Sequence, residues 1–289
     1  TGSGCAINGV ATHGPCTAEG QIPPQAPLPK MAPVVLITGA SGIAAATAKL
    51  AVRSGASVYL LSRDPRKTDA LRKELESTGG KVDGAAADVS IEAEVEAGVA
   101  RCAERFGRID ALFHVAGISG SRWGDGPVHQ CTPAGWDTVM GVNARGTFLV
   151  CHHVAARMLT QQPRGRERGS ILNMTSILGI RPMPEFFHSH AYAASRGAVI
   201  SLSLAMAGSY APHRIRVNAI APGLTETKMA GRAVEDPAIV AAMQRKQSLT
   251  GGILSPEEVA EAAWFFLSPA SRAVTGQILH VDGGWSVTG

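Results

Sequence analysis

Two side chains that could exchange a proton lie close together in the run YAASR, where Tyr192 precedes Arg196 by four residues. Residues at this spacing share one face of a helix, so the phenol and the guanidinium would be neighbours. A cation beside a phenol favours the phenolate, and a phenol that can lose and regain its proton is an acid–base catalyst. Ser176, in the upstream run ILNMTSILG, ends an apolar segment. Together with a glycine-rich turn near the start of the domain, this group predicts acid–base chemistry.

Each of these residues also has a purely structural interpretation. Tyr192 and the small residues around it could simply pack a helix against its neighbours. A serine at the end of a strand, such as Ser176, often caps a turn. Nucleophilic acyl transfer is not indicated, because the GxSxG turn of serine hydrolases does not occur in the sequence.

The length of the chain suits one large α/β domain or two small ones. The chain has 289 residues, of which 45% are hydrophobic and 17% are charged, which favours extensive burial and a large subunit interface. The net charge of +4 is spread without a basic cluster, so nucleic-acid binding has no support. No apolar run approaches the roughly 20 residues that span a membrane. The five scattered cysteines form no CxxC pair or Cys/His cluster, so no metal site is indicated and a cytoplasmic location fits.

Residues 1–30 differ in character from the rest of the chain. They are rich in glycine and proline, show no periodicity, and lack the basic start and apolar stretch of a signal peptide. We expect a disordered N-terminal extension over residues 1–30 and one domain over residues 31–289. Met31 immediately precedes the first predicted strand, and one hypothesis is that it is the natural start.

After Met31, short apolar runs alternate with longer amphipathic stretches. The predicted strands are Val34–Thr38, Ser57–Ser62, Val82–Ala87, Ala111–Val115, Ser170–Thr175, Arg216–Ile220 and Gln277–Val281. The predicted helices are Ile43–Arg53, Pro65–Ser77, Glu92–Phe106, Pro133–Thr160, Ala191–Ala211 and Pro256–Leu267, several of them with a capping side chain before a proline. Such alternation predicts βαβ units in a doubly wound parallel sheet. Residues 118–131 and 222–254 are interpreted as loops.

The run VVLITGASGIAAATAKL leads from the first strand through a turn of small residues into a helix. Gly39 and Gly42 permit close backbone approach, and the N-terminus of the helix would face a pyrophosphate. The position of this turn on the first strand favours nucleotide binding, although many tight turns of this kind bind nothing.

The end of the second strand, in the run YLLSRDPRK, indicates which nucleotide would bind. At this place an acidic side chain takes the ribose hydroxyl of NAD, whereas an arginine takes the 2′-phosphate of NADP. Ser62 followed by Arg63 favours NADP, with NAD as the alternative, because Asp64 more plausibly caps the helix that starts at Pro65. Arg63 could instead be a solvated surface charge. Asp88 and Val89 close the third strand, where they would contact the adenine unless Asp88 caps the next helix.

Taken together, these runs resemble the short-chain dehydrogenase/reductase family across about residues 33–289. The matching runs are TGASGIA (38–44), ADV (87–89), HVAG (114–117), VNARG (142–146), ILNMTS (171–176), YAASR (192–196), RVNAIAPG (216–223) and VTGQILHVDGG (274–284). The resemblance implies a single Rossmann-like domain with a seven-stranded parallel sheet and helices on both faces. It also implies hydride transfer between a nicotinamide cofactor and an alcohol or carbonyl substrate.

The resemblance assigns roles by position. Tyr192 would be the acid–base residue, Ser176 would hydrogen-bond the substrate oxygen, Asn143 would hold a water in a proton relay, and Arg196 occupies the place of the family lysine. The residues implied to bind the cofactor are Thr38, Gly39, Ser41, Gly42, Ile43, Ser62, Arg63, Asp88, Val89, Ala116, Gly117, Tyr192, Arg196, Pro222, Gly223, Thr225 and Thr227.

Three departures from the family pattern affect these expectations. The glycine loop is one residue shorter than TGxxxGxG and ends in Ala44, which predicts weaker cofactor binding. His114 replaces the first asparagine of NNAG, either as a substitute donor or as a satisfied histidine at a strand end. Arg196 replaces the lysine of YxxxK. A guanidinium keeps the positive charge and can bond a ribose, but it does not release a proton in proteins, so it would impair a proton relay. We therefore expect a slow but real enzyme.

The substrate is not named by the sequence. Between Ser176 and Tyr192, Phe186 and Phe187 would either form an apolar substrate wall or pack in a local core, and HSH (188–190) has no third metal ligand nearby. Trp123 lies in a glycine-rich loop that would form the opposite rim. The family places helices like 133–160 and 191–211 in a dimer interface, so a homodimer or homotetramer is expected. The alternative to an enzyme is a catalytically impaired relative that binds a nucleotide or a partner protein.

Overall fold

A sheet of seven parallel strands organises the residues that the computed structural model describes, which are 32–288. The strand order is β3-β2-β1-β4-β5-β6-β7. The strands are β1 (Val34–Thr38), β2 (Ser57–Ser62), β3 (Val82–Ala86), β4 (Ala111–His114), β5 (Gly169–Met174), β6 (Ile215–Pro222) and β7 (Ile278–Val281). All pairs are parallel, which confirms the predicted fold class.

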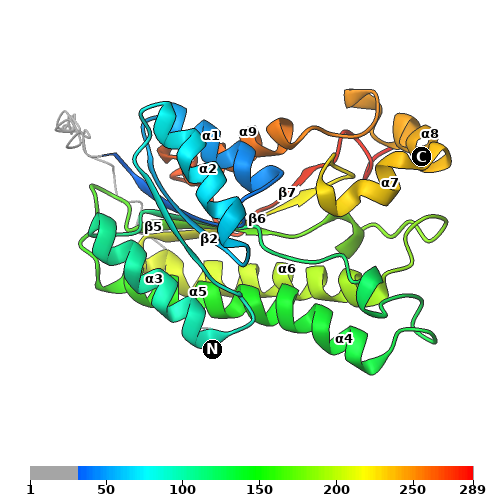
Figure 1. The fold of residues 1–289 in the computed structure, drawn as a ribbon, viewed down its shortest axis with the longest axis horizontal. Coiled ribbons are helices and arrows are strands. Elements are labelled where there is room, and N and C mark those ends of the chain that lie inside the picture. The colour runs from blue at the N-terminus through cyan, green and yellow to red at the C-terminus, as the bar shows by residue number, and fades with distance from the viewer. Residues whose placement is uncertain (1–31, 289) are drawn as a thin grey trace, which may run out of the picture. The chain divides into compact units, whose positions relative to one another are not determined.

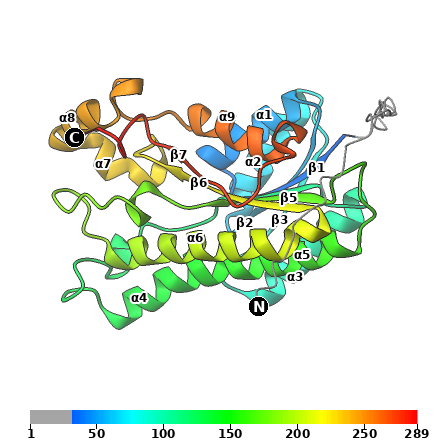
Figure 2. The same ribbon diagram turned by 180° about the vertical axis from the view of Figure 1, so that it is seen from behind.

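Helices cover both faces of the sheet, as Figures 1 and 2 show. One face carries α1 (Ile43–Arg53), α2 (Pro65–Ser77) and α9 (Pro256–Leu267). The opposite face carries α3 (Glu92–Phe106), α4 (Pro133–Met140), α5 (Gly146–Thr160) and α6 (His190–Tyr210). The short helices α7 (Gly231–Glu235) and α8 (Pro237–Lys246) lie beyond the sheet, near the C-terminal segment (Figure 1).

The buried apolar runs of the sequence account for this layering. Every residue of β1, β5 and β6 is buried, as expected for strands that are covered on both faces. The chain winds outward from β1 in one direction and from β4 in the other. The carboxyl ends of these two neighbouring strands therefore form the switch point at which open α/β sheets bind ligands.

Most predicted elements agree with the structure to within two residues, but two segments differ. The helix predicted over Pro133–Thr160 is interrupted by a π-helical turn at Gly141–Arg145, which separates α4 from α5. The segment 222–254, interpreted as a loop, contains α7 and α8, and Asp236 caps the latter before Pro237. The capping side chains predicted before the helix-starting prolines are present, and they are Asp64, Thr132 and Ser255.

The described residues form one compact unit, within residues 31–289. The extension predicted over residues 1–30 and the proposed start at Met31 lie outside the described residues. Within residues 32–288, no helix has the length and apolar character needed to cross a membrane.

A buried hydrogen bond joins β1 to β4 at the switch point. The Thr38 hydroxyl oxygen accepts the backbone N–H groups of Val115 (2.9 Å) and Ala116 (3.0 Å) and lies 3.1 Å from Nδ1 of His114. Because both acceptor positions of this oxygen are used, its own proton must be donated to Nδ1. The neutral imidazole of His114 therefore carries its proton on Nε2. Burial, and then the charge of Arg196, lower the pKa of His114 from 6.5 to about 3 and keep the ring neutral.

The variant His114→Asn is expected to lose less stability in acid than the parent protein. Between pH 6.5 and about 3 the unfolded chain binds a proton at His114 that the folded protein excludes. The free energy of unfolding therefore falls by up to about 1.4 kcal/mol per pH unit as the pH decreases through this window. Urea unfolding of both proteins at several pH values between about 4 and 7 measures this slope, whatever the stability at neutral pH.

The exposed His129 offers a matched control. His129→Asn should keep the parental slope. Equal slopes for His114→Asn and the parent protein would show that His114 does not exclude a proton in the folded state.

Candidate active site

The four predicted catalytic residues meet at the carboxyl end of the sheet. Ser176 follows β5 directly, and Tyr192 and Arg196 lie on the first turns of α6. Asn143 lies in the π-helical turn between α4 and α5. Such turns are frequent at functional sites, because the extra residue redirects a side chain that a regular helix would point elsewhere.

The guanidinium of Arg196 is the centre of this group. The residue is only 2% exposed, and Nη1 donates to the carbonyl oxygen of Met174 at the end of β5, at 3.1 Å. Its Cζ lies 4.9 Å from the centroid of the Tyr192 ring, which is a cation–π distance. Nε is buried and has no hydrogen-bond partner among the described residues. The predicted neighbourhood of phenol and cation is therefore present, with the cation turned into the protein.

The glycine at the end of β4 explains how the guanidinium fits. A Cβ atom on Gly117 would overlap Nη2 of Arg196 and lie 3.0 Å from Oδ1 of Asn143. Because glycine has no side chain, the arginine can occupy this space. Gly117, predicted as a cofactor-binding residue, thus lies directly between two of the catalytic candidates.

Asn143 is fully buried and held on both sides of its amide. Its Oδ1 accepts the backbone N–H of Ile118 at 2.8 Å, and Nδ2 donates to the Ile118 carbonyl and to the Ser195 hydroxyl, both at 3.0 Å. Its backbone carbonyl accepts the hydroxyl of Thr147 at 2.6 Å. These contacts fix the asparagine beside α6 and also fix the beginning of the loop that follows β4.

Ser176 is attached to α6 through its neighbours in the chain. Thr175 donates its hydroxyl to the carbonyl oxygen of Arg196 at 2.9 Å, and Met174 accepts from the guanidinium of the same residue. The Ser176 side chain accepts the N–H of Leu178 at 3.2 Å, so its hydroxyl proton is available to another acceptor. The two residues before Ser176 therefore hold the end of β5 against the helix that carries Tyr192 and Arg196.

His114 adds a second buried donor on the same side of the sheet. Leu112 packs in the cluster under α3, α5 and α6, so His114, two residues further along β4, points to that face as well. Its Nε2 is buried and without a hydrogen-bond partner among residues 32–288. The expectation of a satisfied histidine is met at Nδ1 only, and the expectation that His114 substitutes as a donor stays a prediction. The ring is satisfied at Nδ1, as a histidine at a strand end would be, and it retains a donor at Nε2.

The glycine turn after β1 forms the second part of the site. Gly39 and Gly42 have positive φ angles of 104° and 54°, and α1 starts at Ile43, with no acidic residue in its first turn. Ala44 fits at the last glycine position because its Cβ faces Gly39, where an added Cβ would lie only 3.2 Å away. The shortened loop therefore keeps its close packing, and the N-terminal N–H groups of α1 remain directed at this end of the sheet.

Thr227 approaches the same turn from the segment after β6. A Cβ on Gly42 would lie 3.0 Å from Cγ2 of Thr227. Further back in this segment, Gly223 donates to the carbonyl of Val281 and Thr225 donates its hydroxyl to the carbonyl of Gly223. The residues after Pro222 that were predicted to bind the cofactor therefore extend from the end of β6 to the glycine turn.

Arg63 and Asp88 lie at the other end of the predicted nucleotide site, after β2 and near the end of β3. The guanidinium is 69% exposed and lies 3.7 Å from the Asp88 carboxylate. Burial raises the pKa of Asp88, but hydrogen bonds from Ser90 and the charge of Arg63 lower it by more, so the carboxylate is held ionised. Asp64 caps α2, as expected, by accepting the N–H of Arg66. Ser62, Arg63 and Asp88 are separated from the tyrosine by β1 and β4.

The aromatic pair near the site belongs to a small hydrophobic core. Phe186 and Phe187 pack against buried residues of α8 and the C-terminal segment, and the ring centroids of Phe187 and Trp285 are 6.0 Å apart. The expectation of local packing is therefore met.

The histidines of the run HSH have other contacts. His190 accepts the N–H of Val128 at Nδ1, and the described residues contain no cluster of ligands for a metal ion.

Sequence reasoning missed three residues that hold the site together. Asp125 accepts the backbone N–H groups of Ala191 and Tyr192. Ser195 bridges Asn143 to the carbonyl of Tyr192, and Thr175 bonds α6. No local pattern marks Asp125, because its partners lie 66 and 67 residues away. The adjacency of Ser195 to Arg196 was the only signal for the serine.

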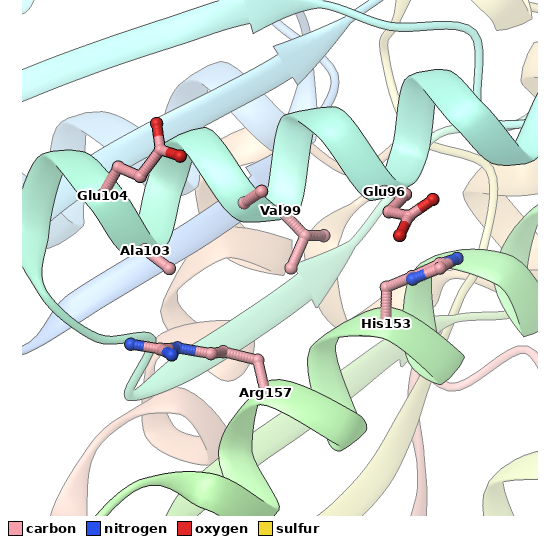
Figure 3. Close-up of a pocket in the computed structure, with 7 residues that line it drawn as sticks. Glu96, Val99, Ala103, Glu104, His153 and Arg157 are labelled. Carbon is pink, nitrogen blue, oxygen red and sulfur yellow. The ribbon is translucent and has the colours of Figure 1, made fainter.

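A groove of about 490 Å³ lies elsewhere, between α3 and α5 (Figure 3). It is lined by Glu96, Val99, Ala100, Ala103, Glu104, His153 and Arg157. None of these is a predicted site residue. The groove is therefore separate from the constellation around Tyr192.

Comparison with known proteins shows the family of this chain. The family model described as enoyl-(acyl carrier protein) reductase matches residues 37–286. The 2-(S)-hydroxypropyl-CoM dehydrogenase 3 of Xanthobacter autotrophicus is 35% identical over 256 residues, which cover 87% of this chain and 95% of that protein. The 3-oxoacyl-(acyl-carrier-protein) reductase FabG of Thermotoga maritima is 36% identical over 252 residues, which cover 87% and 96%.

A solved structure gives the same result for the fold. The crystal structure of an actinorhodin polyketide ketoreductase variant with NADPH is similar at a TM-score of 0.77 and 31% identity, covering 89% of this chain and 98% of that chain. The matches extend over nearly all of the described domain, and this chain belongs to the short-chain dehydrogenase/reductase family of oxidoreductases.

Proposed function

We propose that this protein is an NADP(H)-dependent oxidoreductase that interconverts an alcohol and a carbonyl compound, with Tyr192 as its acid–base residue. The observation that carries the proposal is the packing of the Tyr192 ring on the buried guanidinium of Arg196, 4.9 Å from ring centroid to Cζ. Ser176 and Asn143 adjoin this pair at the carboxyl end of the sheet. The names of the relatives, which are dehydrogenases and reductases, support the same reaction class.

The residues around the glycine turn fit a dinucleotide. Gly42 has a positive φ angle, and a Cβ there would lie 3.0 Å from Cγ2 of Thr227, so a residue with a side chain would disturb the turn that leads into α1. The first turn of α1 offers N–H groups and the positive end of its helix dipole. Thr38, Gly39, Ser41 and Ile43 belong to this turn, whereas Ala116, Gly117, Pro222, Gly223 and Thr225 would border the nicotinamide part. When bound, the cofactor supplies or accepts a hydride.

The protein's own residues would manage the proton and the developing charge. During reduction, the carbonyl oxygen becomes negative as its carbon accepts hydride. The hydroxyl of Ser176 donates a hydrogen bond to this oxygen, and the phenol of Tyr192 gives it a proton, which completes the alcohol. The cation of Arg196 then stabilises the phenolate through the ring face. In the oxidative direction the phenolate removes the proton from the alcohol.

Replacing Tyr192 by phenylalanine tests the assignment directly. Tyr192→Phe removes the proton donor but keeps the ring that packs on Arg196, so turnover should fall by at least about 100-fold. NADPH binding, followed by nicotinamide fluorescence, should remain within a few-fold of the parent. The substrates are a panel of ketones, diketones and hydroxysteroids. Tyr210→Phe, in the last turn of the same helix, is the matched control. A Tyr192→Phe enzyme with parental turnover would disprove the acid–base role.

The arginine is expected to limit the rate of the enzyme. A lysine at position 196 could pass a proton onward, whereas a guanidinium cannot be deprotonated in a protein. Arg196→Lys should therefore increase kcat on the substrates that the parent protein accepts, with NADPH binding retained. If the variant binds NADPH but turns over no faster, the explanation in terms of proton transfer is wrong.

The enclosed position of Arg196 also favours one alternative function, nucleotide binding without turnover. Its guanidinium is buried against the carbonyl of Met174 and the ring of Tyr192, and a guanidinium does not release a proton in proteins, so it would not pass a proton onward. The alternative is supported if NADPH binds tightly and neither the parent nor Arg196→Lys turns over any substrate of the panel.

Arg63 is proposed to select NADP over NAD. Its guanidinium is largely exposed after β2 and adjoins Asp88 only loosely, so it is free to bind a 2′-phosphate. Arg63→Ala should raise KM for NADPH by about 10-fold and leave KM for NADH nearly unchanged, since a charged hydrogen bond contributes about 1.5–3 kcal/mol. Arg66→Ala, at the start of α2, is the control. An unchanged preference between the two cofactors would exclude Arg63 as the determinant.

A homodimer or homotetramer is proposed from the helices on one face of the sheet. Phe148 and Leu159 of α5 and Leu204 of α6 are exposed large apolar residues, which a partner subunit would cover.

A cytoplasmic location is proposed from the cysteines. Among the described residues, Cys102, Cys131 and Cys151 are free thiols, which suits the reducing conditions of the cytoplasm.

A further inference from the structure

The helix that carries Tyr192 and Arg196 is capped from outside its own sequence. Ser189 occupies the N-cap position of α6, but its side chain makes no capping hydrogen bond. Instead, Oδ1 of Asp125 accepts the N–H of Ala191 and Oδ2 accepts the N–H of Tyr192, each at 2.9 Å. These belong to the second and third residues of the helix, whose N–H groups an N-cap side chain ordinarily takes. Asp125 therefore replaces the local cap.

Asp125 belongs to the rim loop, which we define as residues 118–131, and this loop has further contacts with the same helix end. The N–H of His190 donates to the carbonyl of Gly126 at 3.2 Å, and Val128 donates its N–H to Nδ1 of His190 at 3.0 Å. Four hydrogen bonds thus join the rim loop to the first turn of α6. They satisfy the three N–H groups of residues 190–192, which would otherwise lack a partner at the start of the helix.

The backbone of the rim loop is shaped to present this carboxylate. Gly120 and Gly124 have φ angles of 87° and 88°, a conformation that other residues rarely adopt. A Cβ on Gly120 would meet Oδ2 of Asp125 at 2.6 Å and a methyl group of Val139 at 2.7 Å. A side chain at position 120 would therefore displace the carboxylate from the helix.

The rim loop also holds Asn143, so it connects two parts of the active site. At its first residue, Ile118 exchanges two hydrogen bonds with the Asn143 side chain. Asn143 in turn donates to Ser195, whose hydroxyl donates to the carbonyl of Tyr192 at 2.7 Å. Both backbone groups of Tyr192 are thus fixed, the N–H by Asp125 and the carbonyl by Ser195. The result is a closed series of contacts from the loop through Asn143 to the tyrosine and back to the loop.

From these contacts we infer that Asp125 is a positioning residue for Tyr192, and that it couples the rim loop to the acid–base group. The inference rests on the proposed function, since it concerns the placement of the proposed acid–base residue. A substrate that shifts the rim loop, which carries the half-exposed Trp123, must also shift the carboxylate that holds the tyrosine backbone. Contact of the substrate with the rim loop thereby affects the position of the Tyr192 phenol, which transfers the proton.

Substitution of Asp125 tests the coupling. Asp125→Asn has the same shape but replaces one of two acceptor oxygens by a donor, and Asp125→Ala removes both. For each variant kcat should fall by 10-fold or more on the panel substrate that the parent turns over fastest, because small displacements of reacting groups are costly. The dissociation constant of NADPH should stay within about twofold, as the glycine turn is not involved. Asp137→Asn, an exposed carboxylate on α4, should leave kcat unchanged.

A second variant separates positioning from simple helix capping. Ser189→Asp places a carboxylate at the N-cap itself, where it can accept the same N–H groups without the rim loop. In the double variant Ser189→Asp/Asp125→Ala, the melting temperature should return towards the parental value while kcat stays low. Full recovery of kcat would overturn the inference, because Asp125 would then serve only to cap the helix.

The remaining outcomes distinguish this inference from the proposed function. If Tyr192→Phe loses turnover but Asp125→Asn and Asp125→Ala keep the parental kcat, the coupling is refuted and the acid–base role stands. If Tyr192→Phe retains turnover, the proposed function itself fails. If Asp137→Asn lowers kcat as much as Asp125→Asn, the effect is general to carboxylates near the site, and the inference is also refuted.

Discussion

A positive charge buried without an opposite charge is the feature on which the rest of this site depends. Removing a guanidinium from water costs several kcal/mol unless charged or polar groups replace the lost hydration. The guanidinium of Arg196 donates a hydrogen bond to the carbonyl oxygen of Met174 and packs on the face of the Tyr192 ring. No carboxylate among the described residues pairs with it. A buried donor without a partner adds a cost of about 1–3 kcal/mol. The arrangement is therefore poor for stability, and such local costs are typical of functional sites.

A second buried arginine in the same sheet shows what a structural role looks like. Arg216 on β6 pairs with Glu167 at 3.3 Å and donates to the carbonyls of Phe266 and Ser268 and to the hydroxyl of Ser271. Its charge and nearly all its donors are satisfied by the fold. Arg196 has neither a counter-ion nor a full set of acceptors, although both side chains are more than nine-tenths buried. The two arginines are similarly buried but differ in their partners, and the proposed role of Arg196 rests on this difference.

Much of the fold and of the site could be predicted from sequence because the signals are local. Strands such as β1 and β2 are continuous apolar runs, and Asp64 and Ser255 mark helix starts by side chain and proline together, so these boundaries were correct. The π-helical turn at Gly141–Arg145 was missed because residues 134–160 contain no proline that would mark an interruption of the helix. Helices α7 and α8 were missed because their flanking glycines and prolines resemble loop composition.

What could not be predicted is the set of contacts between segments far apart in the chain. The trans cap by Asp125 depends on the left-handed turns of the rim loop, and a glycine-rich sequence allows many such turns without selecting one. The departures from the family pattern also depend on contacts between distant residues, and the sequence does not reveal which residue faces which. Ala44 is accommodated because the residue facing it is Gly39.

His114 and Arg196 likewise belong together. Burial and the charge of Arg196 both lower the pKa of the imidazole, so the histidine stays neutral and adds no second charge to the buried cation. A residue that remained charged at position 114 would place two like charges on the same side of the sheet. The neutral imidazole at position 114 is therefore compatible with a buried cation at position 196, whereas a permanently charged residue there would not be.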